Sequence, residues 1–417
     1  MDAARSVEAV WRLESARLIA GLARLVRDVG LAEELAQDAL VAALEQWPVE
    51  GVPDNPGAWL MTTGKRRAID HIRRQERYAR KLEEVGRDLD TEAPPPEPDE
   101  IEDDLLRLVF TACHPILPTE PRVALALRVL CGLSMPEIAR AFLVPETTVA
   151  QRITRAKRAL ADAGVPFEVP QGAQLAERLA SVLEVIYLVF NEGYSATAGD
   201  DWMRPALGDD ALRLGRLCAE LMPRQPEVHG LVALLEIQAS RTRARTGPNG
   251  EPILLLDQDR TRWDRLLIGR GRAALDKAEA LTSEPGPYQL QAAIAACHAR
   301  AVRPEDTDWA RIAELYATLA VRDPSPVVEL NRAVALAMAH GPAAGLAHVD
   351  TLLEAPSLKD YHLLPSVRGD FLAKLGRLDE ARAEFERAAG MTRNARERAL
   401  LLERAAATQR SATTKPT

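Results

Sequence analysis

The chain has 417 residues, a formal net charge of -8 and a hydrophobic content of 47%. This length suffices for roughly two to four domains with cores of their own, which excludes a peptide or a disulfide-stabilised mini-protein. Aromatic residues make up only 4%, leucine and alanine are abundant, and prolines separate helix-length segments. This composition favours many packed helices, so we predict an all-α protein. The negative net charge leaves nucleic-acid binding to local basic clusters.

The four cysteines have neither CxxC spacing nor a histidine at zinc-finger distance, and we expect buried, reduced thiols. They are Cys113, Cys131, Cys218 and Cys297. No segment reaches the roughly 18 uncharged apolar residues of a membrane span, and the charged N-terminal residues fit a helix. We therefore expect a cytoplasmic protein without membrane association.

The chain divides by composition into five parts. A first helical block covers residues 1–82, and an acidic, proline-rich linker over 83–104 is predicted to be extended because it has little to bury. A second helical block covers 105–166. After a boundary near Pro170, an alanine- and leucine-rich body covers 175–407, and residues 408–417 are predicted to be a disordered tail.

A basic helix is predicted at the end of the first block. Its spacing places Met61, Ala68 and Ile72 on one side. The other side carries mainly basic residues: Arg66, Asp70, Arg73 and Arg77. Beside Trp47 and Trp59, this surface suits a DNA backbone or an unpaired base that stacks on an aromatic ring. A solvated charged face with both tryptophans in the core is the alternative.

The second block contains a helix-turn-helix pattern. Ser134 is predicted to cap a short helix that turns Ile138 and Ala139 inward, and a second helix begins near Glu146 after a tight turn. One stripe of this second helix is apolar: Val149, Ile153, Ala156 and Leu160. The opposite face carries hydrogen-bond donors: Thr147, Gln151, Thr154, Arg155 and Arg158. An apolar back and a donor-rich front are what a DNA-reading helix needs, whereas an ordinary helical hairpin is the alternative.

These motifs, in this order, resemble an RNA polymerase sigma factor of the extracytoplasmic-function class over residues 8–165. Residues 31–44 resemble its core-binding element, 59–74 its promoter-melting and -10 reading helix, and 133–160 its -35 reading domain. The acidic stretch stands where that family has its inter-domain linker. One departure is Gly64-Lys65-Arg66 in place of Ala-Arg-Asn, where the glycine is expected to soften the helix.

The resemblance implies three sets of site residues. In the core-binding set, we expect Glu33, Glu34, Gln37 and Asp38 to be exposed. Core polymerase is expected to contact Glu33, Glu34, Gln37, Asp38 and Val41. The -10 element is expected to contact Trp59, Lys65, Arg66, Asp70, Arg73, Arg74 and Arg77. The -35 element is expected to contact Thr147, Thr148, Gln151, Arg152, Thr154, Arg155 and Arg158.

The C-terminal body carries one clear tetratricopeptide signature. Its small and aromatic positions are Gly369, Gly376, Ala381, Phe385 and Ala388. An upstream copy begins at Gly341 but has Leu346 and Asp350 where alanine and an aromatic are expected. We therefore predict one good repeat and several degenerate ones, stacked into one TPR-like body.

Three segments of this body resemble the long C-terminal extension of one sigma-factor subgroup: residues 190–194, 257–265 and 286–291. The resemblance implies a regulatory extension. The acids of the second segment alternate with arginines, so neighbouring salt bridges account for them better than a catalytic or metal site. We expect no enzyme, no cofactor and no metal.

Three functions fit these observations. The first is a sigma factor whose partners are core RNA polymerase and promoter DNA, with a protein or peptide partner for the extension. The second is a free-standing helix-turn-helix regulator with a ligand- or peptide-binding helical domain, and the third is a scaffold without a DNA role. Residues 31–44 favour the first, because a simple regulator needs no core-docking helix, and the two basic helices speak against the third.

Overall fold

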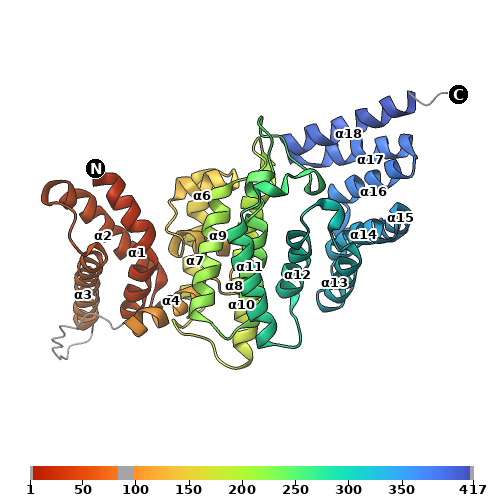
Figure 1. Cartoon of the computed structure of the whole chain (residues 1–417). Coiled ribbons are helices and arrows are strands. Elements are labelled where there is room, and N and C mark those ends of the chain that lie inside the picture. The colour runs from red at the N-terminus through yellow and green to blue at the C-terminus, as the bar shows by residue number, and fades with distance from the viewer. Residues whose placement is uncertain (1–2, 83–97, 414–417) are drawn as a thin grey trace. The chain divides into compact units, whose positions relative to one another are not determined.

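The computed structural model describes residues 3–82 and 98–413, and it divides into two compact units, residues 1–188 and 189–417 (Figure 1). In this described part the secondary structure is α-helical apart from short 3-10 turns and two two-residue strands, which confirms the all-α prediction. The first unit contains α1 (Ala3–Val26), α2 (Val29–Glu50), α3 (Pro56–Leu82), α4 (Pro98–Ala112), α5 (Thr119–Val129), α6 (Met135–Phe142), α7 (Glu146–Asp162) and most of α8 (Ala173–Tyr194).

The second unit continues with a series of helices joined by short connections. They are α9 (Pro205–Leu221), α10 (Pro226–Ala239), α11 (Arg265–Leu281), α12 (Pro287–Arg300), α13 (Trp309–Arg322), α14 (Pro326–His340), α15 (Pro342–Asp350), α16 (Leu363–Lys374), α17 (Leu378–Met391) and α18 (Ala395–Thr413). The strands are β1 (Ala198–Gly199) and β2 (Arg393–Asn394), and the 3-10 turns are η1 (Thr242–Ala244), η2 (Leu255–Asp257), η3 (Arg260–Arg262), η4 (Pro304–Asp306) and η5 (Pro356–Leu358). Many of these helices open on proline, where its missing N–H costs no hydrogen bond.

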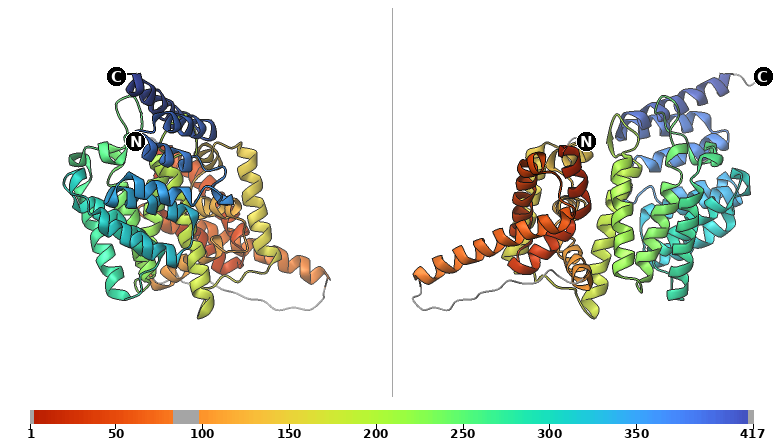
Figure 2. Two further views of the ribbon diagram at one scale, coloured as in Figure 1. Left: turned by 90° about the vertical axis from the view of Figure 1, so that its right-hand side faces the viewer. Right: turned by 60° about the vertical axis from the view of Figure 1, so that its left-hand side comes forward.

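In the first block α2 and α3 pack against α1, whose Leu18, Ile19 and Leu22 are almost fully buried, and α4 of the second block packs on α1 as well. A Cβ atom at Gly64 of α3 would lie 3.0 Å from Leu22 Cδ1. The glycine therefore permits a close approach of α3 to α1, a packing role beyond the softening expected from sequence. Beyond this contact α3 projects as a long single helix (Figure 2).

The second block starts earlier than predicted. Helix α4 begins at Pro98, so residues 98–104 are helical rather than extended, and a proline at the first helical position is compatible with that start. The rest of the predicted linker, residues 83–97, lies outside the described residues.

Most of α8, as far as Leu188, belongs to the first unit, which corrects the boundary expected near Pro170. Arg178 donates to the carbonyl of Phe110 over 3.0 Å, and Ser181 donates to that of Cys113 over 2.5 Å. Arg122 of α5 donates to Glu184 over 2.8 Å. These partners lie about sixty residues apart in sequence, so no local pattern signalled them.

The predicted tetratricopeptide pair forms α16 and α17. A Cβ atom at Gly369 would lie 3.0 Å from the ring of Phe385, which is buried, and Gly376 adopts a φ of 78° in the turn between the helices. The small residue admits the aromatic ring, as the signature requires. The degenerate pair upstream is α14 and α15, where a Cβ at Gly345 would overlap Ala337.

A short clasp joins the two ends of the second unit. Strands β1 and β2 pair in parallel, and Asn394 Nδ2 donates to the carbonyls of Ala196 and Asp201 over 3.1 and 2.9 Å. Its Oδ1 accepts from the backbone of Glu397 at the start of α18 over 3.2 Å. The body is thus closed by a contact between segments about 195 residues apart rather than left as an open stack.

The C-terminal helix is longer than predicted. Helix α18 runs to Thr413, so residues 408–413 of the expected disordered tail are helical, and Thr408 is buried. Good helix-forming residues such as alanine, glutamine and arginine account for the extension. Residues 414–417 lie outside the described part. The four cysteines are buried, as expected, and none of the described helices is long and apolar enough to span a membrane.

Candidate nucleic-acid and polymerase interface

The helix-turn-helix is built by a capping box and a left-handed turn. Ser134 Oγ accepts from the backbone of Glu137, whose carboxylate in turn accepts from the backbone of Ser134 over 2.8 Å. Leu143 closes α6 in the left-handed conformation, with φ 50°, and α7 begins at Glu146. Ile138 and Ala139 are buried. The cap, the turn and the start of the second helix are therefore confirmed.

Helix α7 separates an apolar back from a polar front. It buries the four predicted stripe residues, Val149, Ile153, Ala156 and Leu160. The exposed members of the predicted -35 set are Thr147, Gln151, Thr154, Arg155 and Arg158, whereas Thr148 and Arg152 are partly buried. Arg158 pairs with Asp162 one turn away over 3.3 Å, and both side chains remain mostly exposed. An ion pair of this kind is weak in water and readily exchanged for a phosphate.

Helix α3 presents the predicted basic face. Arg66, Asp70, Arg73, Arg74 and Arg77 are exposed, and Ala68 on the other side is buried. Lys65 is partly buried and already has an interaction partner within the chain. The exposed guanidinium groups form a positive surface on a negatively charged protein, which suits a phosphate backbone.

The two tryptophans have different environments. Trp47 is buried, whereas Trp59 is half-buried at the start of α3, and their rings meet edge to face with centroids 5.4 Å apart. Trp47 thus serves the core, as the alternative interpretation expected. Of the two rings, only that of Trp59 keeps part of its surface exposed.

The α2 face differs from the expectation at one position. Glu34, Asp38 and Val41 are exposed and Gln37 is half-buried, but Glu33 is only 5% exposed. Glu33 accepts from Arg128 Nε of α5 over 2.8 Å and from Lys157 Nζ of α7 over 2.7 Å. The prediction that Glu33 is exposed is therefore wrong, because two cations of the second block enclose its carboxylate.

Further ion pairs join the first block to the second. Arg12 pairs with Glu137 over 2.5 Å, and Arg24 pairs with the buried Asp104 over 3.4 Å. Glu137 is held ionised: burial acts to raise its pKa, but bonds from Ser134 and the nearby Arg12 lower it overall. The sequence did not indicate that Arg128 and Lys157 pair with Glu33. The only signal it offers is that each is a basic residue on an otherwise apolar side of its helix.

The segments that resemble the family's extension lie at close helix contacts of the second unit. A Cβ at Gly193 would lie 2.4 Å from the backbone nitrogen of Gly208. Glu227 of α10 accepts from the backbone nitrogens of Tyr288 and Gln289 over 2.9 and 3.1 Å, which caps α12. Burial raises the pKa of Glu227 although both bonds favour its ionised form.

The acids and arginines of residues 257–265 mainly form hydrogen bonds with backbone groups rather than salt bridges with one another. Asp259 and Asp264 accept from backbone N–H groups at the starts of η3 and α11. Arg260 points inward and donates to the carbonyls of His298 and Ala301, both over 2.8 Å. Burial, with Arg241 and Arg260 nearby, lowers the pKa of His298 to about 3. The segment is structural, with capping and buried hydrogen bonds in place of the predicted salt bridges.

Three family models match separate parts of the chain. Sigma-70 region 2 matches residues 12–78, sigma-70 region 4 matches residues 107–160, and a family of unknown function, DUF6596, matches residues 178–279. The matches to regions 2 and 4 imply core RNA polymerase and promoter DNA as partners, and sigma factors are non-enzymatic transcription factors.

Three similar proteins cover different shares of the chain. An uncharacterized protein, R00370, of Rhizobium meliloti (strain 1021) is 49% identical over 91% of this chain and 90% of its own length. The probable ECF RNA polymerase sigma factor SigI of Mycobacterium tuberculosis is 28% identical over 39% of this chain and 57% of its own length. The crystal structure of yeast Tom70 aligns with a TM-score of 0.38 and 11% identity over 93% of this chain and 82% of Tom70.

The chain shares its family with the Rhizobium protein over nearly its whole length, and its N-terminal half carries both sigma domains in order. It belongs to the extracytoplasmic-function sigma factors that carry a C-terminal extension.

Proposed function

We propose that this sigma factor docks on core RNA polymerase through the exposed edge of α2, contacts the -10 element through α3 and reads the -35 element through α7. The observation that carries the proposal is the amphipathic character of α7. Its apolar stripe is buried while Gln151, Thr154 and Arg155 are exposed on the opposite side. Arginine and glutamine side chains in this position form bidentate hydrogen bonds with base edges in the major groove.

Core docking through the whole α2 face requires the two blocks to separate. Glu33 belongs to the expected core-binding set, yet Arg128 and Lys157 enclose it. Glu34 and Asp38 stay exposed and are available for a first encounter, in which charges at the rim govern the rate of association. The arrangement described here is therefore the form of the protein before it binds polymerase.

The test is formation of holoenzyme by purified chain and core polymerase. Charge reversal of Glu34 and Asp38 to lysine is expected to weaken the complex at moderate salt. Glu45→Lys is the matched control, because Glu45 is exposed further along the same helix. Equal competition for core by the double variant and the wild-type chain would contradict docking through this face.

We further propose that the second unit is required for regulated promoter activity. It has no element like α7 among its described residues, but its match to a family model begins inside α8, at residue 178. Helix α8 is also part of the packing of the second block, so the extension and the DNA-reading block share one continuous helix.

The experiment compares the full chain with a chain ended after Leu188 in transcription from the cognate promoter at matched holoenzyme occupancy. We expect lower or unregulated activity without the second unit. A chain ended at Pro170 is expected to be poorly soluble, because buried Arg122 loses Ser181 and Glu184 as partners. Equal transcription by the full chain and the Leu188 form, both folded by circular dichroism, would contradict a role in initiation.

A further inference from the structure

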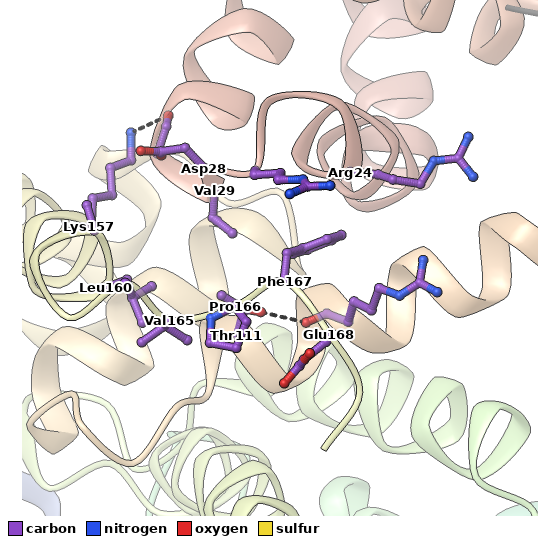
Figure 3. A pocket seen from close by; sticks show the side chains of 15 residues that line it. Arg24, Asp28, Val29, Thr111, Lys157, Leu160, Val165, Pro166, Phe167 and Glu168 are labelled. Carbon is purple, nitrogen blue, oxygen red and sulfur yellow. Dashed lines mark hydrogen bonds between the residues drawn. The ribbon is translucent and has the colours of Figure 1, made fainter. Parts of the chain in front are cut away.

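A pocket of about 580 Å³ lies between the first and second blocks, inside the first unit. Its walls come from the end of α1, the start of α2, α4, the end of α7 and the connector after α7 (Figure 3). This volume falls within the range of pockets that hold small organic molecules. None of the proposed contacts with polymerase or promoter uses it.

Four cations and two acids line this pocket. Lys157 and the arginines Arg24, Arg27 and Arg107 are the cations, whereas Asp28 and Glu168 are the acids. The Asp28 carboxylate is already engaged, because it accepts from the backbone of Leu31 over 2.9 Å as the cap of α2. Among the lining side chains the cations thus outnumber the acids by four to two.

Carboxylates outside the lining hold three of these cations in place. The almost fully buried Asp104 lies 2.6 Å from Arg107 and 3.4 Å from Arg24, and Glu33 holds Lys157. A guanidinium group has five N–H donors, so the carboxylates of Asp103 and Asp104 leave some of those of Arg107 available to a ligand. Arg27 is exposed and, among the described residues, has no carboxylate within ion-pair distance.

The rest of the wall is apolar. Val29 and Leu160 are buried behind it, and Val165, Pro166 and Phe167 come from the connector. In Figure 3 the side chain of Phe167 lies near the centre of the view, with Arg24 above and to the right of it and Pro166 below and to the left. A pocket lined by both an aromatic side chain and guanidinium groups suits a molecule that has both a flat apolar part and an anionic group.

We propose that this pocket binds a small organic anion, a phosphate or carboxylate attached to a planar apolar group, and that the bound ligand holds the two blocks together. Ligand binding is coupled to block separation because both blocks contribute to the pocket wall. Arg24 and Arg27 belong to the first block, whereas Lys157 belongs to the second and Phe167 to the connector that follows it. A ligand that contacts both sides binds the joined form and loses its site when the blocks separate. This coupling rests on the proposed docking through α2, because joined blocks keep Glu33 covered.

Binding is tested by calorimetry on the full chain with guanosine 5′-monophosphate, 1-naphthoate, inorganic phosphate and uncharged guanosine. The first two probes distinguish a phosphate from a carboxylate source. We expect at least one of them to bind, and guanosine and inorganic phosphate to bind about tenfold or more weakly, because each lacks one of the two recognised parts. Arg27→Asn should weaken binding by a similar factor; asparagine tolerates the φ of 54° at this position. Arg224→Asn, at an exposed arginine of the second unit, is the matched control.

Coupling is tested by core polymerase binding with and without the best probe. The expected result is weaker core binding in the presence of the probe for the wild-type chain and the control, and no change for Arg27→Asn. Failure of every probe at millimolar concentration, or equal binding by wild type and Arg27→Asn, would overturn the site. Binding that leaves core affinity unchanged would overturn the coupling, whereas a ligand-free chain that never binds core would instead refute the proposed sigma function.

Discussion

Replacing Lys157 with methionine tests whether the ion pairs on Glu33 keep the core-binding face closed. Lys157 Nζ lies 2.7 Å from Glu33 and 3.6 Å from Glu34, and it also donates to the carbonyl of Gly30 over 3.3 Å. The side chain of Glu33 is 7% exposed and that of Lys157 is 18% exposed, so solvent screens this pair poorly. Methionine keeps the apolar stem and removes the charge, while α2 remains unaltered.

The expected effect follows from the strength of a charge-assisted hydrogen bond. Such a bond contributes about 1.5 to 3 kcal/mol, and Arg128 still compensates part of the Glu33 charge after the substitution. The equilibrium between joined and separated blocks should shift by about tenfold to a hundredfold toward separation. Where the separated form is the minor one, the apparent affinity for core polymerase rises by the same factor.

The assay is equilibrium binding of fluorescently labelled chain to core polymerase without DNA, so that any change in -35 reading has no effect. Lys359→Met provides a matched control at an exposed lysine of the second unit. We expect tighter core binding by Lys157→Met and an unchanged value for the control. If Lys157→Met bound core no more tightly than the wild type, the ion pairs would not limit access and the reasoning would be refuted.

Three other predictions concern single side chains. Arg155→Ala should relax the preference for one base of the -35 element at a cost of about 1 to 3 kcal/mol, whereas Arg158→Ala should weaken binding to all sequences alike; footprints on promoter variants that show no such difference would contradict the assignment. The unfolded chain protonates His298 near pH 6.5 but the folded chain only at about pH 3, so stability should fall as the pH drops through this window, by about 1.4 kcal/mol per unit. Urea denaturation of His298→Gln should therefore show a flatter pH profile than that of the wild type or of His340→Gln at an exposed position. Asn394→Ala should destabilise the second unit by about 2 to 4 kcal/mol, because it leaves buried carbonyls and the start of α18 without partners; an unchanged urea midpoint would show that the clasp carries little stability.

Local sequence patterns predicted the structural features that depend on residues close together in sequence. Ser134 stands three residues before Glu137, and this spacing alone indicates a capping box. The stripe from Val149 to Leu160 follows the helical period, so its burial was readable from sequence. Gly369 and Phe385 likewise belong to one short repeat, and both take the places that the signature assigns to them.

Contacts between distant segments were not readable in the same way. Glu33 follows the buried Ala32 on α2, and nothing in its surroundings distinguishes it from the exposed Glu34. Its partners Arg128 and Lys157 are 95 and 124 residues away, and a single sequence gives no signal that joins them. The same reason explains why α8, taken from sequence as the start of the extension, packs instead on α4 and α5.

Helix α7 links the three parts of the proposed mechanism. Successive residues on a helix lie about 100° apart, so Lys157 stands to one side of the face that carries Arg155 and Arg158. One helix therefore carries the donors proposed to read DNA and, on its flank, covers Glu33 and forms a wall of the proposed anion pocket. These interactions are linked if core binding requires α7 to leave α2. A ligand that holds α7 against α2 then lowers the affinity for core polymerase by some factor, and bound core polymerase lowers the affinity for that ligand by the same factor. A ligand in the pocket and the ion pairs on Glu33 thus oppose polymerase through the same contact, and promoter DNA that binds α7 better in the separated form would act in the opposite direction.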